Sequence, residues 1–318
     1  MLGLIPLFAL AYGLVVVGGA AAVLREMNRP RRKTLGVALA AGGAGDPADL
    51  GLQAEAVTLN LGDGSRSPGW RIRGDAPTGP SAVVVHGHRD SRFGAMYRAQ
   101  TVLPFVREAV VFDLPGHGEA EAASGKMGAR EADDIAAVVA GAVPGAIPGA
   151  VVLMGSSMGA TFVVKAAARH PEVFRHGGGV VALAPYRFWD EGLRGQLRRR
   201  RVPAWPVVPL VGLILRVWPG RWGLGERPGF DRAADAAELT APLLVVHGDD
   251  DAICPLDAGR AIAEAAPRGR LHVVPGGTHN HLLTVDPGAT RETFAAFFAD
   301  VAADSSPAGA SPRASIGP

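Results

Sequence analysis

The apolar residues of this chain gather into short, almost continuous runs that are separated by longer stretches with helical spacing. Runs without alternation of apolar and polar residues are typical of strands buried on both faces of a sheet. Because helical stretches lie between successive runs, the pattern predicts parallel strands joined by right-handed crossovers, which is an α/β fold. The expected strands lie within residues 55–60, 69–73, 81–87, 109–118, 150–155, 178–185, 241–251 and 269–274, and the clearest helices within 129–143, 158–170 and 289–302.

The N-terminus has a different pattern, because no charged residue occurs from Leu2 to Leu24. A run of about 20 apolar residues is long enough to span a bilayer as a helix. The basic cluster within Arg25–Lys33 follows the run, and positive charges there resist translocation. We therefore expect residues 1–24 to be a single-pass transmembrane anchor, with the rest of the chain on the cytoplasmic side. A cleaved signal peptide and a buried helix are the alternatives, and the lack of a basic residue before the run argues against the first.

Composition divides the remaining chain. We expect a basic juxtamembrane segment and a linker over residues 25–54 and a folded domain over residues 55–304. Residues 305–318 are rich in serine and proline, so we expect a disordered tail there. The formal net charge of +2 gives no reason to expect a protein that binds polyanions over its whole surface. Because Cys254 is the one cysteine, an intrachain disulfide is excluded, and we expect Cys254 to be a small packing residue. The basic run Arg198–Arg201 lacks interleaved stacking aromatics, so we expect a solvated or membrane-facing patch and no nucleic-acid partner.

An insert between about residues 185 and 232, rich in proline, tryptophan and arginine, interrupts the alternation of strands and helices. From Val202 to Val217 it is almost wholly apolar, with Arg216 as its only charge. Prolines in the first half of this stretch argue against a regular helix there, whereas the second half predicts a short one. The insert contains Trp189, Trp205, Trp218 and Trp222.

Residues 152–160, VLMGSSMGA, lead an apolar strand directly into a tight turn and then into a helix-forming stretch. The turn has the form Gly155-x-Ser157-x-Gly159, and this context is that of a nucleophile elbow, whose flanking positions must be small. The motif predicts Ser157 as a catalytic nucleophile. A tight glycine turn with an incidental serine is the alternative.

A serine nucleophile needs backbone N–H groups that bind the oxyanion formed during acyl transfer. Met158 follows the serine directly, and His88 follows the strand within residues 81–87, so their amides are the candidates. We expect no metal, because the covalent serine route replaces a metal-bound water. We also expect no nucleotide cofactor, because no Gly-x-Gly-x-x-Gly loop follows the first parallel strand.

The serine also needs a base and an orienting carboxylate. His279 and His281 come shortly after the strand that ends at Val274, and His279 directly follows the sequence Gly-Gly-Thr. We favour His279 over His281, partly on the resemblance given below. Spacing does not choose among the carboxylates, which are those of Asp249, Asp250 and Asp251. The chain order serine, aspartate, histidine agrees with an elbow of this type.

With these residues in place, the chain resembles the α/β-hydrolase superfamily from about Leu50 to Ala302. The resemblance rests on the segments VVVHGHRDSR, FDLPGHGEA, GSSMG, VVHGDDDAICP and GGTHNHLL, which occur in the expected order. Within the superfamily the chain resembles bacterial serine hydrolases of the monoglyceride-lipase-like and dienelactone-hydrolase-like kind, some of which are membrane-anchored. The resemblance implies a mostly parallel sheet of about eight strands, helices on both faces and a cap insert.

The resemblance also selects the acid and the base. The acid of such relatives stands two residues before an isoleucine or valine and four before a proline, as Asp251 does relative to Ile253 and Pro255. The histidine usually precedes an asparagine or another small polar residue, which selects His279 before Asn280.

This chain departs from its relatives at two places near the expected site entrance. Glu119 follows the Gly-His-Gly sequence, where a serine is common, and the loop His88–Asp90 carries large polar residues where many relatives have small ones. Both changes make the entrance more polar and charged, so the substrates of relatives do not transfer directly.

The function implied by the resemblance is a serine hydrolase that cleaves small-molecule carboxylic esters, using Ser157, His279 and Asp251. Amides and thioesters are less favoured substrates for the same chemistry. Acyl transfer to an alcohol and a non-catalytic interaction protein are the alternative functions, and the complete triad argues against the second. The insert is expected to form a cap over the serine. The cap either packs on the domain alone or is a lid that also touches the bilayer, which favours lipid-like esters with apolar acyl chains.

Overall fold

The computed structural model describes residues 5–125, 128, 130–142, 150–218 and 230–304, so the expectations for the tail at 305–318 and for Trp222 lie outside the described residues. A sheet of eight strands forms the centre of the fold, with the order β1-β2-β4-β3-β5-β6-β7-β8. Strands β3 to β8 are parallel, whereas β2 pairs antiparallel with both β1 and β4. This sheet confirms the predicted α/β fold. The strands are β1 (Ala54–Asn60), β2 (Arg66–Arg73), β3 (Ser81–Val85), β4 (Glu108–Phe112), β5 (Val151–Ser156), β6 (Gly178–Leu183), β7 (Leu243–Gly248) and β8 (Gly269–Val274).

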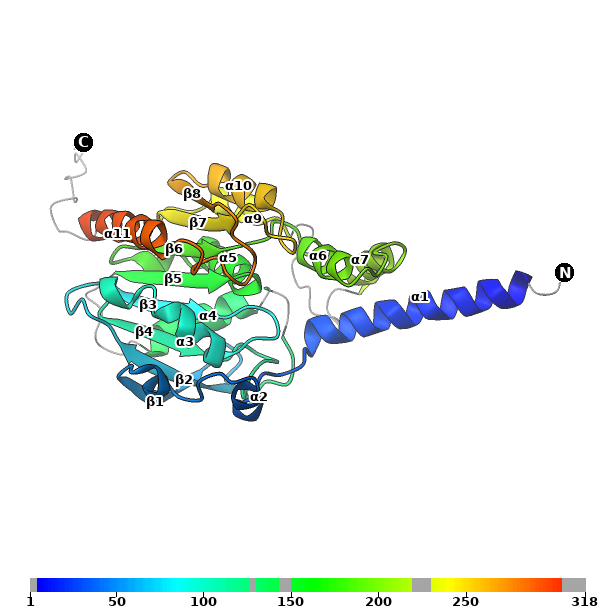
Figure 1. The fold of residues 1–318 in the computed structure, drawn as a ribbon, viewed down its shortest axis with the longest axis horizontal. Helices are drawn as coiled ribbons and strands as arrows, with labels where there is room; N and C mark the ends of the chain where they lie inside the picture. The colour runs from blue at the N-terminus through cyan, green and yellow to red at the C-terminus, as the bar shows by residue number, and fades with distance from the viewer. Residues whose placement is uncertain (1–4, 126–127, 129, 143–149, 219–229, 305–318) are drawn as a thin grey trace, which may run out of the picture.

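The sheet is covered on both faces, which explains the continuous apolar runs. Along β3, Val83 and Val85 belong to one apolar core, whereas Ala82 and Val84 belong to the other, as side-chain alternation requires. Helices α4, α5, α9 and α10 pack on the first core, and α3 and α11 pack on the second (Figure 1). These helices are α3 (Arg92–Ala99), α4 (Glu131–Ala142), α5 (Met158–Arg169), α9 (Arg232–Ala237), α10 (Leu256–Ala265) and α11 (Pro287–Asp304), with short 3-10 turns at Leu103–Phe105 and Pro171–Phe174.

Helix α1 (Ile5–Asn28) is unbroken from the apolar N-terminus to the domain, and it projects from the domain in Figure 1. Its segment Pro6–Asn28 has a mean hydropathy of 2.3, so by length and composition it is a candidate membrane span. Apolar side chains in its first turns, including Phe8 at 71% and Val15 at 72%, are exposed. The last turns pack on the insert, in an apolar cluster of Ala20, Leu24, Met27, Val211 and Leu215.

Residues 34–54, for which we expected a linker, contain α2 (Leu35–Ala40) and a 3-10 turn (Pro47–Leu50). Ala38 is buried in the core that α3 and α11 cover, and the N–H of Ala44 donates to the hydroxyl of Tyr97 at 2.7 Å. The segment is therefore attached to the domain surface along its length. Composition rich in glycine and alanine predicts a linker but carries no information on such contacts.

The insert forms α6 (Glu191–Arg199) and α7 (Val207–Val217). We expected a helix only in the second half of residues 202–217, but α7 begins at Val207. A proline is tolerated there because Pro209 lies in the first turn, where a missing N–H breaks no helical hydrogen bond. Val208, Val211 and Leu215 are buried on one side of α7. The other side, with the segments that flank the helix, exposes the apolar side chains of Val202, Trp205, Leu213, Val217 and Trp218.

Candidate active site

Ser157 stands in a strained turn between β5 and α5. Its φ of +54° lies in a region that L-residues rarely adopt, and its N–H donates to the carbonyl of Leu183 at 2.8 Å. A Cβ on Gly155 would lie 2.2 Å from the carbonyl oxygen of Gly159, and a Cβ on Gly159 would lie 2.5 Å from that of His86. Both flanking positions therefore require glycine, as the elbow motif predicted.

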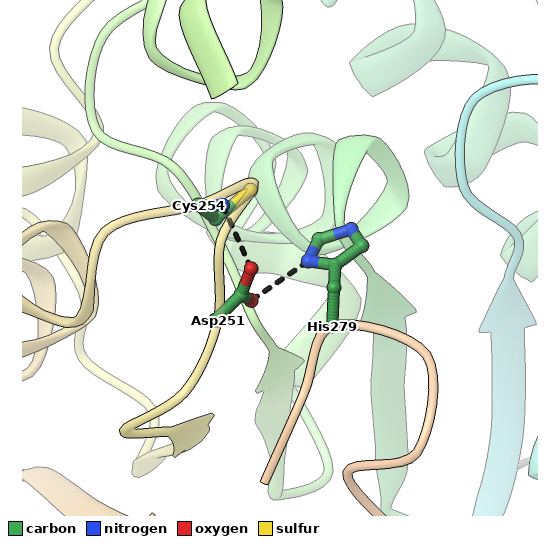
Figure 2. Close-up of side chains that lie close together, drawn as sticks. All are labelled: Asp251, Cys254 and His279. Atoms are coloured by element: carbon green, nitrogen blue, oxygen red, sulfur yellow. Dashed lines mark hydrogen bonds and ion pairs between the residues drawn. The ribbon is translucent and has the colours of Figure 1, made fainter. Parts of the chain in front are cut away.

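A chain of hydrogen bonds joins Ser157 to residues from two other loops. The Oγ of Ser157 lies 3.0 Å from Nε2 of His279, and Nδ1 of His279 lies 2.7 Å from Oδ2 of Asp251. Asp251 follows β7 and His279 follows β8, so both reach the serine from the carboxyl edge of the parallel sheet. Figure 2 shows the Asp251 carboxylate directed at the imidazole. The structure thus brings together the three residues that we expected to form a triad.

The Asp251 carboxylate is almost fully enclosed, with 1% of its side chain exposed. Its other oxygen, Oδ1, accepts hydrogen bonds from the N–H groups of Ile253 at 2.8 Å and Cys254 at 2.9 Å. Burial raises the pKa of Asp251, but the hydrogen bond and the attraction to His279, together with these backbone donors, outweigh burial and hold the pKa below its ordinary value. Asp251 is therefore ionised at neutral pH and is suited to hold an imidazolium.

Cys254 lies in the site, although its sequence context predicted only a packing residue. Burial, then the nearby charge of Asp251, raises the pKa of its thiol, so the sulfur stays protonated at neutral pH. Ligand atoms of Asp251, Cys254 and His279 lie within 4.8 Å of one another (Figure 2), which is a spacing that a metal ion can bridge. Both ring nitrogens of His279 and Oδ2 of Asp251 are already engaged in the hydrogen-bond chain to Ser157, which favours a serine triad at this place.

The loop after β3 lies directly against the elbow. A Cβ on Gly87 would stand 3.4 Å from Cβ of Ser157, and His88 is the next residue. His86 is buried, and its Nε2 accepts the N–H of Leu114 at 3.0 Å, so the proton resides on Nδ1, which donates to the Gly87 carbonyl at 2.8 Å. Burial lowers the pKa of His86, which keeps the ring neutral and this arrangement intact.

Met158 is the first residue of α5, so its N–H lies among the helix N-terminal donors that have no partner within the helix. Within the part of the chain that the structure describes, no protein group accepts a hydrogen bond from the N–H of Met158 or of His88. The amides of Met158 and His88 therefore remain the candidates for oxyanion donors.

The competing residues lie elsewhere. Asp249 and Asp250 are exposed, and Oδ1 of Asp249 accepts the N–H of Gly276 at 2.7 Å, which braces the loop that carries His279. His281 is also exposed, and its N–H donates to the carbonyl of Thr278 at 3.2 Å. None of these three side chains joins the hydrogen-bond chain at Ser157 among the described residues.

The insert contacts the site through the loop that follows Asp251. A Cβ on Gly195 of α6 would lie 2.0 Å from the carbonyl oxygen of Ile253, so α6 rests on the backbone that follows Asp251. Next to it, the rings of Tyr186 and Phe230 stack at 5.8 Å between centroids. The site is therefore bounded by residues of the insert and of its two connections to the domain.

Comparison with known proteins agrees with this architecture. The sequence model of the alpha/beta hydrolase family matches residues 82–293. The chain belongs to this family. Esterase Pf2001 from Pyrococcus furiosus is similar in structure, with a TM-score of 0.62 and 18% identity over 80% of this chain and 94% of its own.

Two further relatives of this α/β-hydrolase differ in how much of it they match. A bacterial membrane phospholipase A has a TM-score of 0.59 and 18% identity, and the match covers 95% of this chain and 98% of its own. The non-heme chloroperoxidase CPO-A1 of Kitasatospora aureofaciens is 44% identical over 50 residues, which are 15% of this chain and 18% of that protein. At such identities the two structural matches bear on the fold alone, and the chloroperoxidase match spans less than a fifth of that relative's length.

Proposed function

We propose that this α/β-hydrolase is a membrane-anchored serine esterase in which Ser157 is the nucleophile, His279 the general base and Asp251 the orienting acid. The observation that carries the proposal is the continuous contact from Ser157 Oγ through His279 to Asp251, with distances of 3.0 Å and 2.7 Å. Esterases among the structural neighbours support the reaction class.

In the acylation step, Ser157 Oγ attacks the ester carbonyl while Nε2 of His279 removes the hydroxyl proton. Asp251 accepts the Nδ1–H of His279 and stabilises the imidazolium that forms. The carbonyl oxygen becomes an oxyanion, which accepts hydrogen bonds from the N–H groups of Met158 and His88. His279 then donates its proton to the departing alcohol oxygen, which leaves an acyl-enzyme on Ser157.

In the second step, water attacks the acyl carbonyl while His279 removes a proton from the water. His279 then returns that proton to Ser157 Oγ as the bond to the acyl group breaks, which releases the acid and restores the serine. An alcohol in the place of water gives acyl transfer through the same groups, which makes an acyltransferase the runner-up. A non-catalytic interaction protein is disfavoured by the intact geometry of all three triad side chains.

Helix α1 supports the anchor proposal, since its apolar first turns expose side chains that have no protein surface to cover them in the described structure. The basic residues within Arg25–Lys33 follow the apolar run, which supports a catalytic domain on the cytoplasmic side. A structural neighbour described as a membrane phospholipase A is consistent with work at a bilayer.

The exposed apolar side chains around α7 support a lid that touches the bilayer. Trp205 is 71% exposed and Trp218 61%, and Leu213 on α7 is 56% exposed, while the opposite side of α7 packs on α1. A helix held against the anchor with tryptophans at its ends suits the headgroup boundary. We therefore propose lipid-like esters with medium or long acyl chains as the substrate class.

The central test uses a serine-directed fluorophosphonate and p-nitrophenyl esters of increasing acyl length on the full-length protein in detergent. Ser157→Ala should abolish labelling and lower turnover by several orders of magnitude, because the nucleophile is removed. Ser156→Ala is the matched control and should keep both. Labelling that persists in Ser157→Ala refutes the triad, and a preference for acetyl over longer esters refutes the proposed substrate class.

A further inference from the structure

The loop that supplies the His88 amide is tied to the end of the membrane helix. We use oxyanion loop for His88–Asp90 and juxtamembrane segment for Glu26–Lys33. Oε1 of Glu26 lies 3.3 Å from Nε2 of His88, and the same oxygen accepts a hydrogen bond from Nε of Arg89. Nζ of Lys33 donates to Oδ1 of Asp90 at 2.9 Å. Each of the three side chains in the oxyanion loop therefore contacts the juxtamembrane segment.

The oxyanion loop has a backbone conformation that needs support. Arg89 has a φ of +59°, a left-handed conformation that is unfavourable for a residue with a side chain. Asp90 is held from two sides, because Nη1 of Arg98 on α3 also binds its carboxylate, at 2.8 Å. With the contact between Arg89 and Glu26, the strained residue and its successor are both anchored through their side chains.

The juxtamembrane segment is itself fixed to the domain, so it can serve as a support. The Arg32 guanidinium donates to the carbonyls of Ala120 at 2.8 Å and Ala122 at 2.7 Å, and the N–H of Gly125 donates to the carbonyl of Asn28 at 3.0 Å. These bonds join the segment to the loop after β4, on the same edge of the sheet as Ser157. The end of α1 is thus part of the wall of the candidate site.

We propose that Glu26 and Lys33 are positioning residues that hold the oxyanion loop so that the N–H of His88 points at the oxyanion on Ser157. This proposal rests on the esterase function proposed above. It accounts for the large polar residues at His88–Asp90, where many relatives have small ones, because their side chains contact the juxtamembrane segment. The membrane helix is then a component of the catalytic apparatus as well as a tether.

The test uses full-length Glu26→Met and Lys33→Met in detergent with p-nitrophenyl butyrate, a small ester that needs no bilayer. Removal of an entire oxyanion donor lowers kcat by about 10²–10³, and a displaced donor should lower it by about 5- to 50-fold in each variant. KM should change by less than about twofold, because the donor acts mainly in the transition state. Affinity for an alkyl trifluoromethyl ketone, which places a negative oxygen at this position, should fall by a similar factor.

The matched control is Asp300→Asn, which removes an ion pair with Arg270 at 2.5 Å at the opposite edge of the sheet and should leave kcat unchanged. Glu26→Met combined with Arg89→Gln should lose no more activity than Glu26→Met alone, because the contact that Arg89→Gln removes is one of those that Glu26→Met already removes. Thermal unfolding checks that the variants fold, and Lys33→Met carries the test if Glu26→Met does not.

Unchanged kcat in the folded variants, or a loss confined to KM, overturns the positioning role. If the unaltered protein shows no turnover that depends on Ser157, the proposed esterase function is refuted instead. The two failures are therefore distinguishable in one set of measurements.

Discussion

The acid of the proposed triad offers the sharpest test, because Asp251→Asn changes hydrogen bonding without changing shape. Oδ1 of Asp251 accepts two backbone N–H groups, and Oδ2 accepts the Nδ1–H of His279 at 2.7 Å. Asparagine offers one carbonyl oxygen and one NH2 group at the same two places. In either orientation the NH2 group therefore meets a hydrogen-bond donor.

The two orientations differ in their consequences. If the NH2 group faced the backbone, the buried N–H groups of Ile253 and Cys254 would lose their acceptor, at about 1–3 kcal/mol for each unsatisfied group. If it faces His279, the ring adopts the tautomer with the proton on Nε2, which can no longer accept the proton of Ser157. We expect the second arrangement and a loss in kcat of about 10³–10⁴, by analogy with the same substitution in a serine protease triad. Such a loss corresponds to roughly 4–5.5 kcal/mol in the activation free energy.

The assay is steady-state hydrolysis of p-nitrophenyl esters by Asp251→Asn beside two neighbouring substitutions. Asp249→Asn should cost less than about fivefold, because the asparagine carbonyl can still accept the N–H of Gly276. Asp250→Asn should be near neutral, since its side chain is exposed. Equal losses at Asp250 and Asp251 would show that the acid is wrongly assigned, and so would a kcat above about a tenth of normal in Asp251→Asn.

Three further outcomes are expected. Gly159→Ala should destabilise the fold by several kcal/mol and abolish fluorophosphonate labelling, because the Cβ of the alanine would lie 2.5 Å from the carbonyl oxygen of His86. Normal labelling with a normal unfolding temperature would contradict the elbow geometry. Burial, then the charge of Glu131, raises the pKa of Asp134 to about 7. Between about pH 4 and pH 7 the folded state therefore retains a proton that the unfolded state releases, and the free energy of unfolding falls as the pH rises through this range. Asp134→Asn should therefore be more stable than the unaltered protein by about 1–4 kcal/mol at pH 8 and not at pH 4 in urea unfolding, and a pH-independent difference would contradict this. The full chain should resist carbonate extraction from membranes, and a C-terminal reporter should be active only in the cytoplasm; activity of a periplasm-specific reporter would overturn the orientation.

The sheet and the elbow were predictable because their signals are local. Continuous apolar runs mark strands such as β3 and β5, whatever lies around them, and the tight turn at Ser157 demands small residues within two positions. The bounds were less predictable. The apolar pattern predicted that β2 starts at residue 69, but it begins at Arg66. Its first residues are polar, and one of them, Ser67, is buried because its hydroxyl donates to the carbonyl of Asp113 at 2.7 Å.

The rest of the candidate site depends on contacts between distant segments. Local spacing did not distinguish Asp251 from Asp249 and Asp250, and the structure separates them through the backbone turn that presents only Asp251 to His279. Resemblance to a family had already favoured the same residue. No local pattern could pair Glu26 with Arg89, because these residues are 63 positions apart and meet only through the docking of α1.

The unbroken course of α1 into the domain has a geometric consequence. A flexible connection would let the domain sample many heights above the bilayer, whereas α1 stays helical to Asn28 and its end is bonded to the site wall. With α1 across a bilayer, the register of the helix sets the depth of Ser157, and each residue added to the apolar run shifts that depth by about 1.5 Å. For the membrane-anchored esterase proposed above, this fixed depth would favour esters whose scissile bond stands at the same distance from the membrane plane.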